Sequence, residues 1–160
     1  LLSGQNIDVL GHWTSEAHKR NKIVLVNPDL IGGLEASQIG LRLLRNHFGV
    51  DGIMSPNLQQ LRMAHKEGLF CIQRIFLLDS QSWDSGLKAL NNSSVDAVEI
   101  LPGTMAPQFV SSLKRKGVAM LAGGFLNTRK QIQELYSLGF LGATTSEKAL
   151  WTYEVPLDTR

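Results

Sequence analysis

Two glycines and three hydroxyl residues stand at spacings that suit phosphate binding. Gly123 and Gly124 end one short apolar run, and Thr144, Thr145 and Ser146 follow at the next, some 20 residues later. Adjacent glycines let backbone N–H groups approach an anion, and hydroxyl residues before a helix supply further donors. The pattern predicts a phosphate site formed by Gly123, Gly124, Thr145 and Ser146. The structural alternative is a tight glycine turn with Ser146 as a helix N-cap.

Four further polar residues stand at the ends of apolar runs and are candidates for ligand binding. They are Asp29, Ser55, Arg74 and Glu99. Arg74 suits an anionic group, and Glu99 can accept hydrogen bonds from hydroxyl groups. A charge at such a position must be paired or solvated, because burying it alone is costly. An Arg74–Glu99 ion pair that braces neighbouring strands is therefore the alternative, and Asp29 alternatively initiates a turn.

The sequence contains no recognisable catalytic or metal-binding constellation. It has no Walker motif, no hydrolase elbow and no GxGxxG fingerprint. Its four histidines lack metal-ligand spacing, and no lysine follows an expected strand for Schiff-base chemistry. The single cysteine, Cys71, lies in an apolar run, which favours a buried, inert thiol over a reactive one. We therefore expect no catalytic residue, no metal and no cofactor.

Repeated βα units are the scaffold that would bring these positions together. Short apolar runs alternate with amphipathic stretches, which is typical of a parallel sheet. Strands are expected at residues 23–26, 52–54, 70–74, 97–101, 118–122 and 142–144, with a seventh at Leu1 and Leu2. Helices are expected at residues 37–48, 58–67, 85–90, 107–116 and 128–137, with a short one at 147–151. Left-handed terminal residues are expected just past four of these helices, at Gly49, Gly68, Gly117 and Gly139.

The strand count favours an α/β fold, a TIM-like (β/α)8 barrel of parallel strands that forms a single domain over residues 1–160. No Pro-rich or Ser-rich linker divides the chain. Because position 1 is Leu and begins like the tail of a strand, we expect the first barrel strand to be absent from this chain. An open doubly wound sheet is the alternative. In both architectures ligands bind at the carboxyl ends of the strands, where the candidate residues fall.

Composition excludes several classes of protein. With 43% hydrophobic and 19% charged residues, the chain is typical of a globular domain, and no apolar run approaches the roughly 20 residues that span a bilayer. The lone cysteine favours a reducing, cytoplasmic location. A net charge of +2 does not by itself indicate nucleic-acid binding. Four basic clusters are either an RNA-binding face or solvated helix faces: His18-Lys19-Arg20, Arg62 with Lys66, Lys114-Arg115-Lys116 and Arg129-Lys130.

Several segments carry a family resemblance. They are Asp29-Leu30-Ile31, Gly33-Leu34, Ile72-Gln73-Arg74-Ile75-Phe76-Leu77-Leu78-Asp79-Ser80, Glu99-Ile100-Leu101-Pro102-Gly103, Ala122-Gly123-Gly124 and Leu150-Trp151. With these motifs, in this order, the chain resembles the glycerol uptake operon antiterminators, the glycerol-3-phosphate-responsive antiterminator family. The resemblance implies a barrel, no enzymatic turnover, glycerol 3-phosphate as effector and binding to leader mRNA to prevent transcription termination.

The resemblance also implies roles for individual residues. Asp29, Arg74 and Glu99 match polar residues at the family's strand ends, and its phosphate corner is matched by Gly123, Gly124, Thr145 and Ser146. The chain departs from the family where His-Ile-Asp-Leu-Ile-Glu-Gly is replaced by Asn27-Pro28-Asp29-Leu30-Ile31-Gly32-Gly33, and Ser-Thr-Lys by Ser55-Pro56-Asn57. A charged hydrogen bond contributes about 1.5–3 kcal/mol, so these changes bear on the effector.

Three hypotheses of function follow. The first is an effector-responsive regulator that binds leader mRNA. The second is a barrel enzyme acting on a small phosphorylated substrate, since this scaffold supports many chemistries. The third is a divergent paralogue that has lost its effector site and is retained for protein interaction. A naturally missing barrel strand would expose sheet edges, which favours a homo-oligomer.

Overall fold

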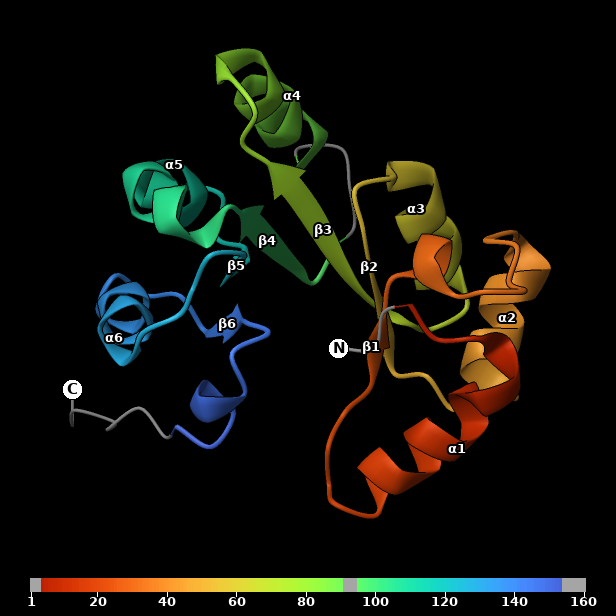
Figure 1. Cartoon of the computed structure of the whole chain (residues 1–160). Coiled ribbons are helices and arrows are strands. Elements are labelled where there is room, and N and C mark those ends of the chain that lie inside the picture. The colour runs from red at the N-terminus through yellow and green to blue at the C-terminus, as the bar shows by residue number, and fades with distance from the viewer. Residues whose placement is uncertain (1–3, 91–94, 154–160) are drawn as a thin grey trace. The chain divides into compact units, whose positions relative to one another are not determined.

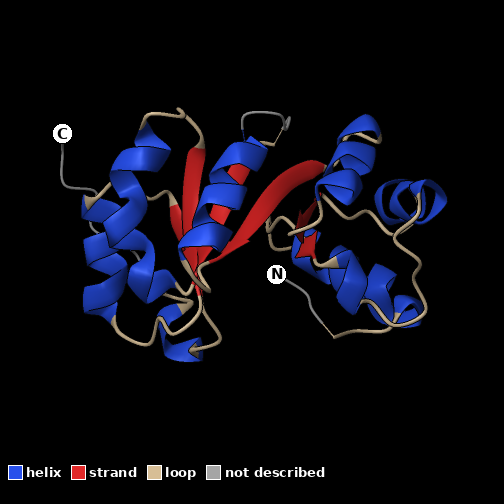
Figure 2. Ribbon diagram, turned by 90° about the horizontal axis from the view of Figure 1, so that it is seen from above, coloured by secondary structure: helices blue, strands red, loops and turns tan. Residues whose placement is uncertain are grey.

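The computed structural model describes residues 4–90 and 95–153. The chain falls into two compact units. Figure 1 labels the helices and strands of both. Unit 1 comprises Leu1–Arg74 and Ala89–Asp96, and unit 2 comprises Ile75–Lys88 and Ala97–Arg160. In both units helices alternate with parallel strands, as Figure 2 shows.

Unit 1 contains three parallel strands with helices between them. In chain order its elements are α1 (Ile7–His18), β1 (Leu25–Val26), the 3-10 helix η1 (Pro28–Leu30), α2 (Gln38–Asn46), β2 (Gly52–Ser55), α3 (Leu58–Lys66) and β3 (Phe70–Phe76), whose last two residues fall in unit 2. Strand β2 is central, with Gly52 in register with both Leu25 of β1 and Phe70 of β3.

The core of unit 1 forms where the apolar faces of its helices meet the strands. Leu41 and Leu44, one turn apart on α2, are fully buried in one cluster with Ile53 of β2 and Leu61 of α3. Cys71 of β3 lies in the same cluster, and burial raises the pKa of its thiol to about 12, with the nearby charge of Asp96 adding to the effect. The expectation of a buried cysteine is confirmed.

Unit 2 repeats the arrangement. Its elements are α4 (Ser80–Leu90, of which the last two residues belong to unit 1), β4 (Ala97–Leu101), η2 (Gly103–Phe109), α5 (Val110–Lys114), β5 (Ala119–Gly123), α6 (Arg129–Ser137), β6 (Gly142–Thr144) and η3 (Lys148–Leu150). Strand β5 pairs in parallel with β4 and with β6, and the second register sets Gly123 opposite Thr144.

A second apolar core supports these strands. Ile100 of β4, Leu113 of α5, Leu135 of α6 and Phe140 before β6 are at most 2% exposed. The ring of Trp83 on α4 packs on Phe109 with a centroid separation of 4.3 Å, which fixes α4 against the segment that follows β4.

The α/β class with parallel strands and alternating helices is confirmed. Strands β4 and β6 have the expected bounds, and the others differ by one or two residues at an end. The expected left-handed glycines are confirmed, with φ of +69° at Gly49, +75° at Gly68, +66° at Gly117 and +94° at Gly139. Six strands fall within residues 4–90 and 95–153, so an eight-stranded barrel is not seen there. The expected strand at Leu1 and Leu2 lies outside the described residues, and the single domain stays a prediction.

Two of the expected helices need correction here, and one helix was missed. The helix expected at 85–90 begins at Ser80, and the helix expected at 107–116 is divided into η2 and α5, with Pro107 inside the 3-10 segment. Proline has no N–H to donate to an α-helical ladder. Helix α1 was not expected because its buried face includes Thr14, whose hydroxyl bonds the carbonyls of Leu10 and Phe48. A buried polar residue there interrupts the apolar periodicity.

Candidate functional site

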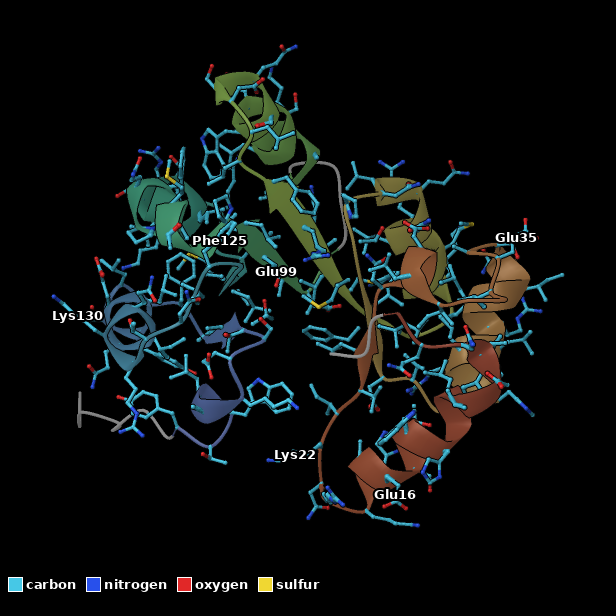
Figure 3. All side chains as sticks on the ribbon, viewed as in Figure 1. Glu16, Lys22, Glu35, Glu99, Phe125 and Lys130 are labelled. Atoms are coloured by element: carbon cyan, nitrogen blue, oxygen red, sulfur yellow. The ribbon has the colours of Figure 1, made fainter. Side chains whose placement is uncertain are left out.

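A buried carboxylate lies within the parallel strands of unit 2. The prediction that Glu99 stands at a strand end is wrong, because it is the middle residue of β4. Glu99 of β4, labelled in Figure 3, is fully buried and accepts a hydrogen bond from the hydroxyl of Thr144 at the end of β6. A Cβ on Gly123 would lie 2.5 Å from Oε1 of Glu99 and would also collide with the Thr144 hydroxyl. A side chain at position 123 would force Glu99 or Thr144 to move, because they occupy the space that it would need.

The loops that follow β4, β5 and β6 are tied together by hydrogen bonds. The N–H of Gly103 donates to the carbonyl of Gly124 at 3.1 Å, and the Thr145 hydroxyl donates to the carbonyl of Leu126 at 2.6 Å. The indole N–H of Trp151 donates to the carbonyl of Thr145 at 2.9 Å. Gly124 has a φ of +80°, a conformation that glycine adopts without strain. These bonds fix the polar loops around the buried carboxylate.

The four residues predicted to bind phosphate all lie in this part of unit 2. Gly123 ends β5, Gly124 follows it, and Thr145 and Ser146 follow β6. The Thr145 hydroxyl stabilises the loop itself, because it donates to the carbonyl of Leu126 and accepts from the N–H of Glu147 at 3.0 Å. Ser146 is exposed.

The alternative that made Ser146 an N-cap is wrong, because the side chain of Glu147 caps η3. The expected helix over 147–151 is only the three-residue turn Lys148–Leu150. So short a helix supplies little dipole for an anion, and phosphate binding here would depend on the backbone of the paired glycines and on Ser146.

In unit 1, two of the predicted ligand residues belong to one hydrogen-bonded chain. The Ser55 hydroxyl donates to Oε1 of Gln60 at 2.6 Å, and the Gln60 amide donates to Oδ1 of Asp29, also at 2.6 Å. Ser55 and Gln60 are buried, whereas Asp29 is exposed. Gln60 thus positions Asp29. Sequence reasoning missed Gln60 because a glutamine in a first helical turn resembles a solvated residue.

Arg74 lies half-buried in β3, beside the buried Gln73. It belongs to unit 1 and Glu99 belongs to unit 2. Their ion pair and the direct contact of either residue with a ligand stay predictions.

The departures from the family pattern have local structural roles. Oδ1 of Asn27 accepts from the N–H of Asp29 at 3.1 Å and so caps η1. Oδ1 of Asn57 accepts from the N–H groups of Gln59 and Gln60 in the first turn of α3. A Cβ at Gly32 would collide with the side chain of Asn6, so a longer residue does not fit there without rearrangement. These positions are adapted to the fold of unit 1.

Two features are absent from the described residues. No group of three or more His, Cys, Asp or Glu side chains among them is arranged to hold a metal ion. No helix among them is long and apolar enough to cross a membrane.

Parallel strands, alternating helices and polar residues at the strand ends define a TIM-like α/β protein. Orotidine 5′-phosphate decarboxylase from Pyrococcus horikoshii OT3 has a similar fold, with a TM-score of 0.62 and 12% identity over 89% of this chain and 76% of that enzyme. The chain belongs to the glycerol-3-phosphate responsive antiterminator family, whose model matches residues 1–151. This confirms the resemblance found in the sequence.

Two solved structures support the assignment. The glycerol uptake operon antiterminator regulatory protein from Listeria monocytogenes str. 4b F2365 has a TM-score of 0.86 and 27% identity, covering 94% of this chain and 81% of its own. A glycerol uptake operon antiterminator-related protein from Thermotoga maritima MSB8 has the same TM-score and identity, covering 95% and 86%. The family is therefore one of regulators, while the more distant fold neighbour is an enzyme.

Proposed function

We propose that this protein is a glycerol-3-phosphate-responsive antiterminator, a cytoplasmic regulator of glycerol metabolism that binds leader mRNA when its effector is bound. Membership of the family over residues 1–151 supports the proposal. The structural observation that carries it is the fully buried Glu99, bonded to Thr144 beneath the side-chain-free Gly123. Burying a carboxylate is costly unless it is hydrogen-bonded. A polyol ligand would donate hydroxyl hydrogen bonds to Glu99 and so offset this cost.

In unit 2, the phosphate group of the effector is assigned to the backbone of Gly123 and Gly124, with Ser146 and the segment around Thr145. Glu99 is assigned to the hydroxyl groups. Asp29 and Ser55, linked through Gln60, and Arg74 are the proposed ligand contacts of unit 1.

We also propose that the complete fold is a TIM-like (β/α)8 barrel. The likeness to the Pyrococcus decarboxylase supports this architecture, and its low identity restricts the comparison to the fold. The proposal includes no enzymatic turnover, because the matching family is described as a responsive antiterminator, which is a regulator.

The function is tested by transcription in vitro through a leader terminator placed upstream of a glycerol uptake gene from the same source. Readthrough is expected to rise only when the protein and glycerol 3-phosphate are both present, with glycerol as the matched control. Readthrough that ignores the effector, or consumption of glycerol 3-phosphate by the protein, would contradict the proposal.

A further inference from the structure

The loops after β5 and β6 expose two large aromatic side chains. Phe125 is 75% exposed and Trp151 is 65% exposed. Phe125 also has a φ of +57°, a left-handed conformation that is unfavourable for a bulky residue. The ring gains no burial in exchange for this strain, so its position is not explained by the packing of unit 2.

Local contacts link the segments that carry these residues to the loop before α6 and to its first turn. The Gln131 amide of α6 donates to the carbonyl of Phe125 at 3.2 Å, and the guanidinium of Arg129 lies 5.1 Å from the ring centroid of Tyr153. Trp151 is joined to the loop of Phe125 through Thr145, as described above. Figure 3 labels Phe125 just before α6 and Lys130 on its first turn. We call Phe125, Arg129, Lys130, Trp151 and Tyr153 the aromatic and basic surface.

The two cations of this surface lie in the first turn of a helix. Arg129 and Lys130 are exposed in the first turn of α6, where the helix dipole disfavours cations, and that turn has no acidic residue. Neither forms an ion pair with a described residue, whereas Lys19 in the cluster after α1 pairs with Glu16 at 2.7 Å. Positive charge beside open aromatic rings suits an anionic partner with stackable faces.

We propose that the aromatic and basic surface binds single-stranded RNA, with bases stacked on Phe125 and Trp151 and phosphates held by Arg129 and Lys130. Single-stranded RNA is recognised by this combination of aromatic stacking and cationic contacts. The inference rests on the proposed function and assigns the surface that performs it. Phe125 directly follows Gly124, so an effector held by the glycines acts on the same loop that presents the ring to RNA.

The test measures binding of a fluorescein-labelled, random-sequence single-stranded RNA pool by anisotropy, at several salt concentrations and with saturating glycerol 3-phosphate. Arg129→Gln with Lys130→Gln is compared with Lys114→Gln plus Arg115→Gln, which removes the same charge from exposed residues near the far end of α5. The first pair is expected to lower the salt slope by about 1.4, and the second to leave it unchanged.

Phe125→Gly separates function from folding. It removes the left-handed strain, so thermal stability is expected to hold or rise, while RNA affinity falls about tenfold through lost stacking. If wild-type protein binds RNA and the first pair and Phe125→Gly bind as tightly, the surface assignment is wrong. If wild-type protein does not bind RNA at any salt concentration, the proposed function itself fails.

Discussion

At the residue scale, Gly123 is the position where the candidate site leaves least room. Its missing side chain accommodates the Glu99 carboxylate and the Thr144 hydroxyl. The sequence predicted glycines here for their backbone access to an anion. The contacts with Glu99 and Thr144 could not be foreseen, because they depend on the registers that set β4 and β6 beside β5.

Gly123→Ala is expected to lower the free energy of unfolding by about 2 kcal/mol, since the added methyl group must displace Glu99 or Thr144. Urea denaturation measures this. Gly117→Ala is the matched control in unit 2, because a Cβ added there meets open space. Only the left-handed φ of +66° adds strain, which costs about 1 kcal/mol. Equal losses in the two variants would refute the crowding at Gly123.

Asp51 makes stability depend on acid pH. Burial raises the pKa of its carboxyl, but hydrogen bonds from the Val24 N–H at 2.6 Å and from His18 at 2.9 Å outweigh this and hold the pKa below its usual 3.8. A carboxyl whose pKa is lower in the folded state stabilises the fold at every pH above its unfolded-state pKa. This contribution is lost as the pH falls through the folded-state pKa.

Asp51→Asn is expected to cost about 1 kcal/mol at neutral pH and to remove part of the acid dependence below pH 3.8. Urea denaturation across the acid range gives both quantities. Glu16→Gln, which removes an exposed carboxylate paired with Lys19, serves as control and should leave the neutral-pH stability unchanged. An unaltered acid profile in Asp51→Asn would contradict this account.

At the scale of elements, the alternation of branched apolar runs and amphipathic stretches was enough to place the strands, because each period is short and strongly marked. The alternation did not locate α1, whose buried Thr14 bonds backbone carbonyls. Nor did it indicate that Asn57, where the family has a lysine, caps α3. Such a role depends on the backbone conformation just before the helix, which the apolar pattern does not specify.

Asn57→Ala is expected to lower the free energy of unfolding by about 1 kcal/mol, because the N–H groups of Gln59 and Gln60 lose their acceptor. Asn57→Ser retains a capping oxygen and should recover most of the stability. Thermal unfolding monitored by circular dichroism distinguishes the two. If both variants melt together, the cap does not contribute.

At the scale of the whole molecule, a fold shared with antiterminator structures at a TM-score of 0.86 and only 27% identity indicates that the scaffold tolerates extensive change. Within it, Glu99 is buried beside Gly123, while Asn27 and Asn57 cap helices of unit 1 and Gly32 packs against Asn6. Sequence resemblance could identify the family. It could not establish whether the altered strand ends still accept the effector, because affinity depends on side-chain geometry in the bound state.

Thermal unfolding with millimolar glycerol 3-phosphate, glycerol or inorganic phosphate tests the central claim most directly. A ligand specific for the native state adds about 2.7 kcal/mol at 100 times its Kd. We predict that glycerol 3-phosphate raises the Tm and that glycerol and inorganic phosphate do not. The shift is expected to be lost in Glu99→Gln, which keeps the side-chain shape. No shift with glycerol 3-phosphate, or an equal shift with inorganic phosphate, would contradict effector recognition by this protein.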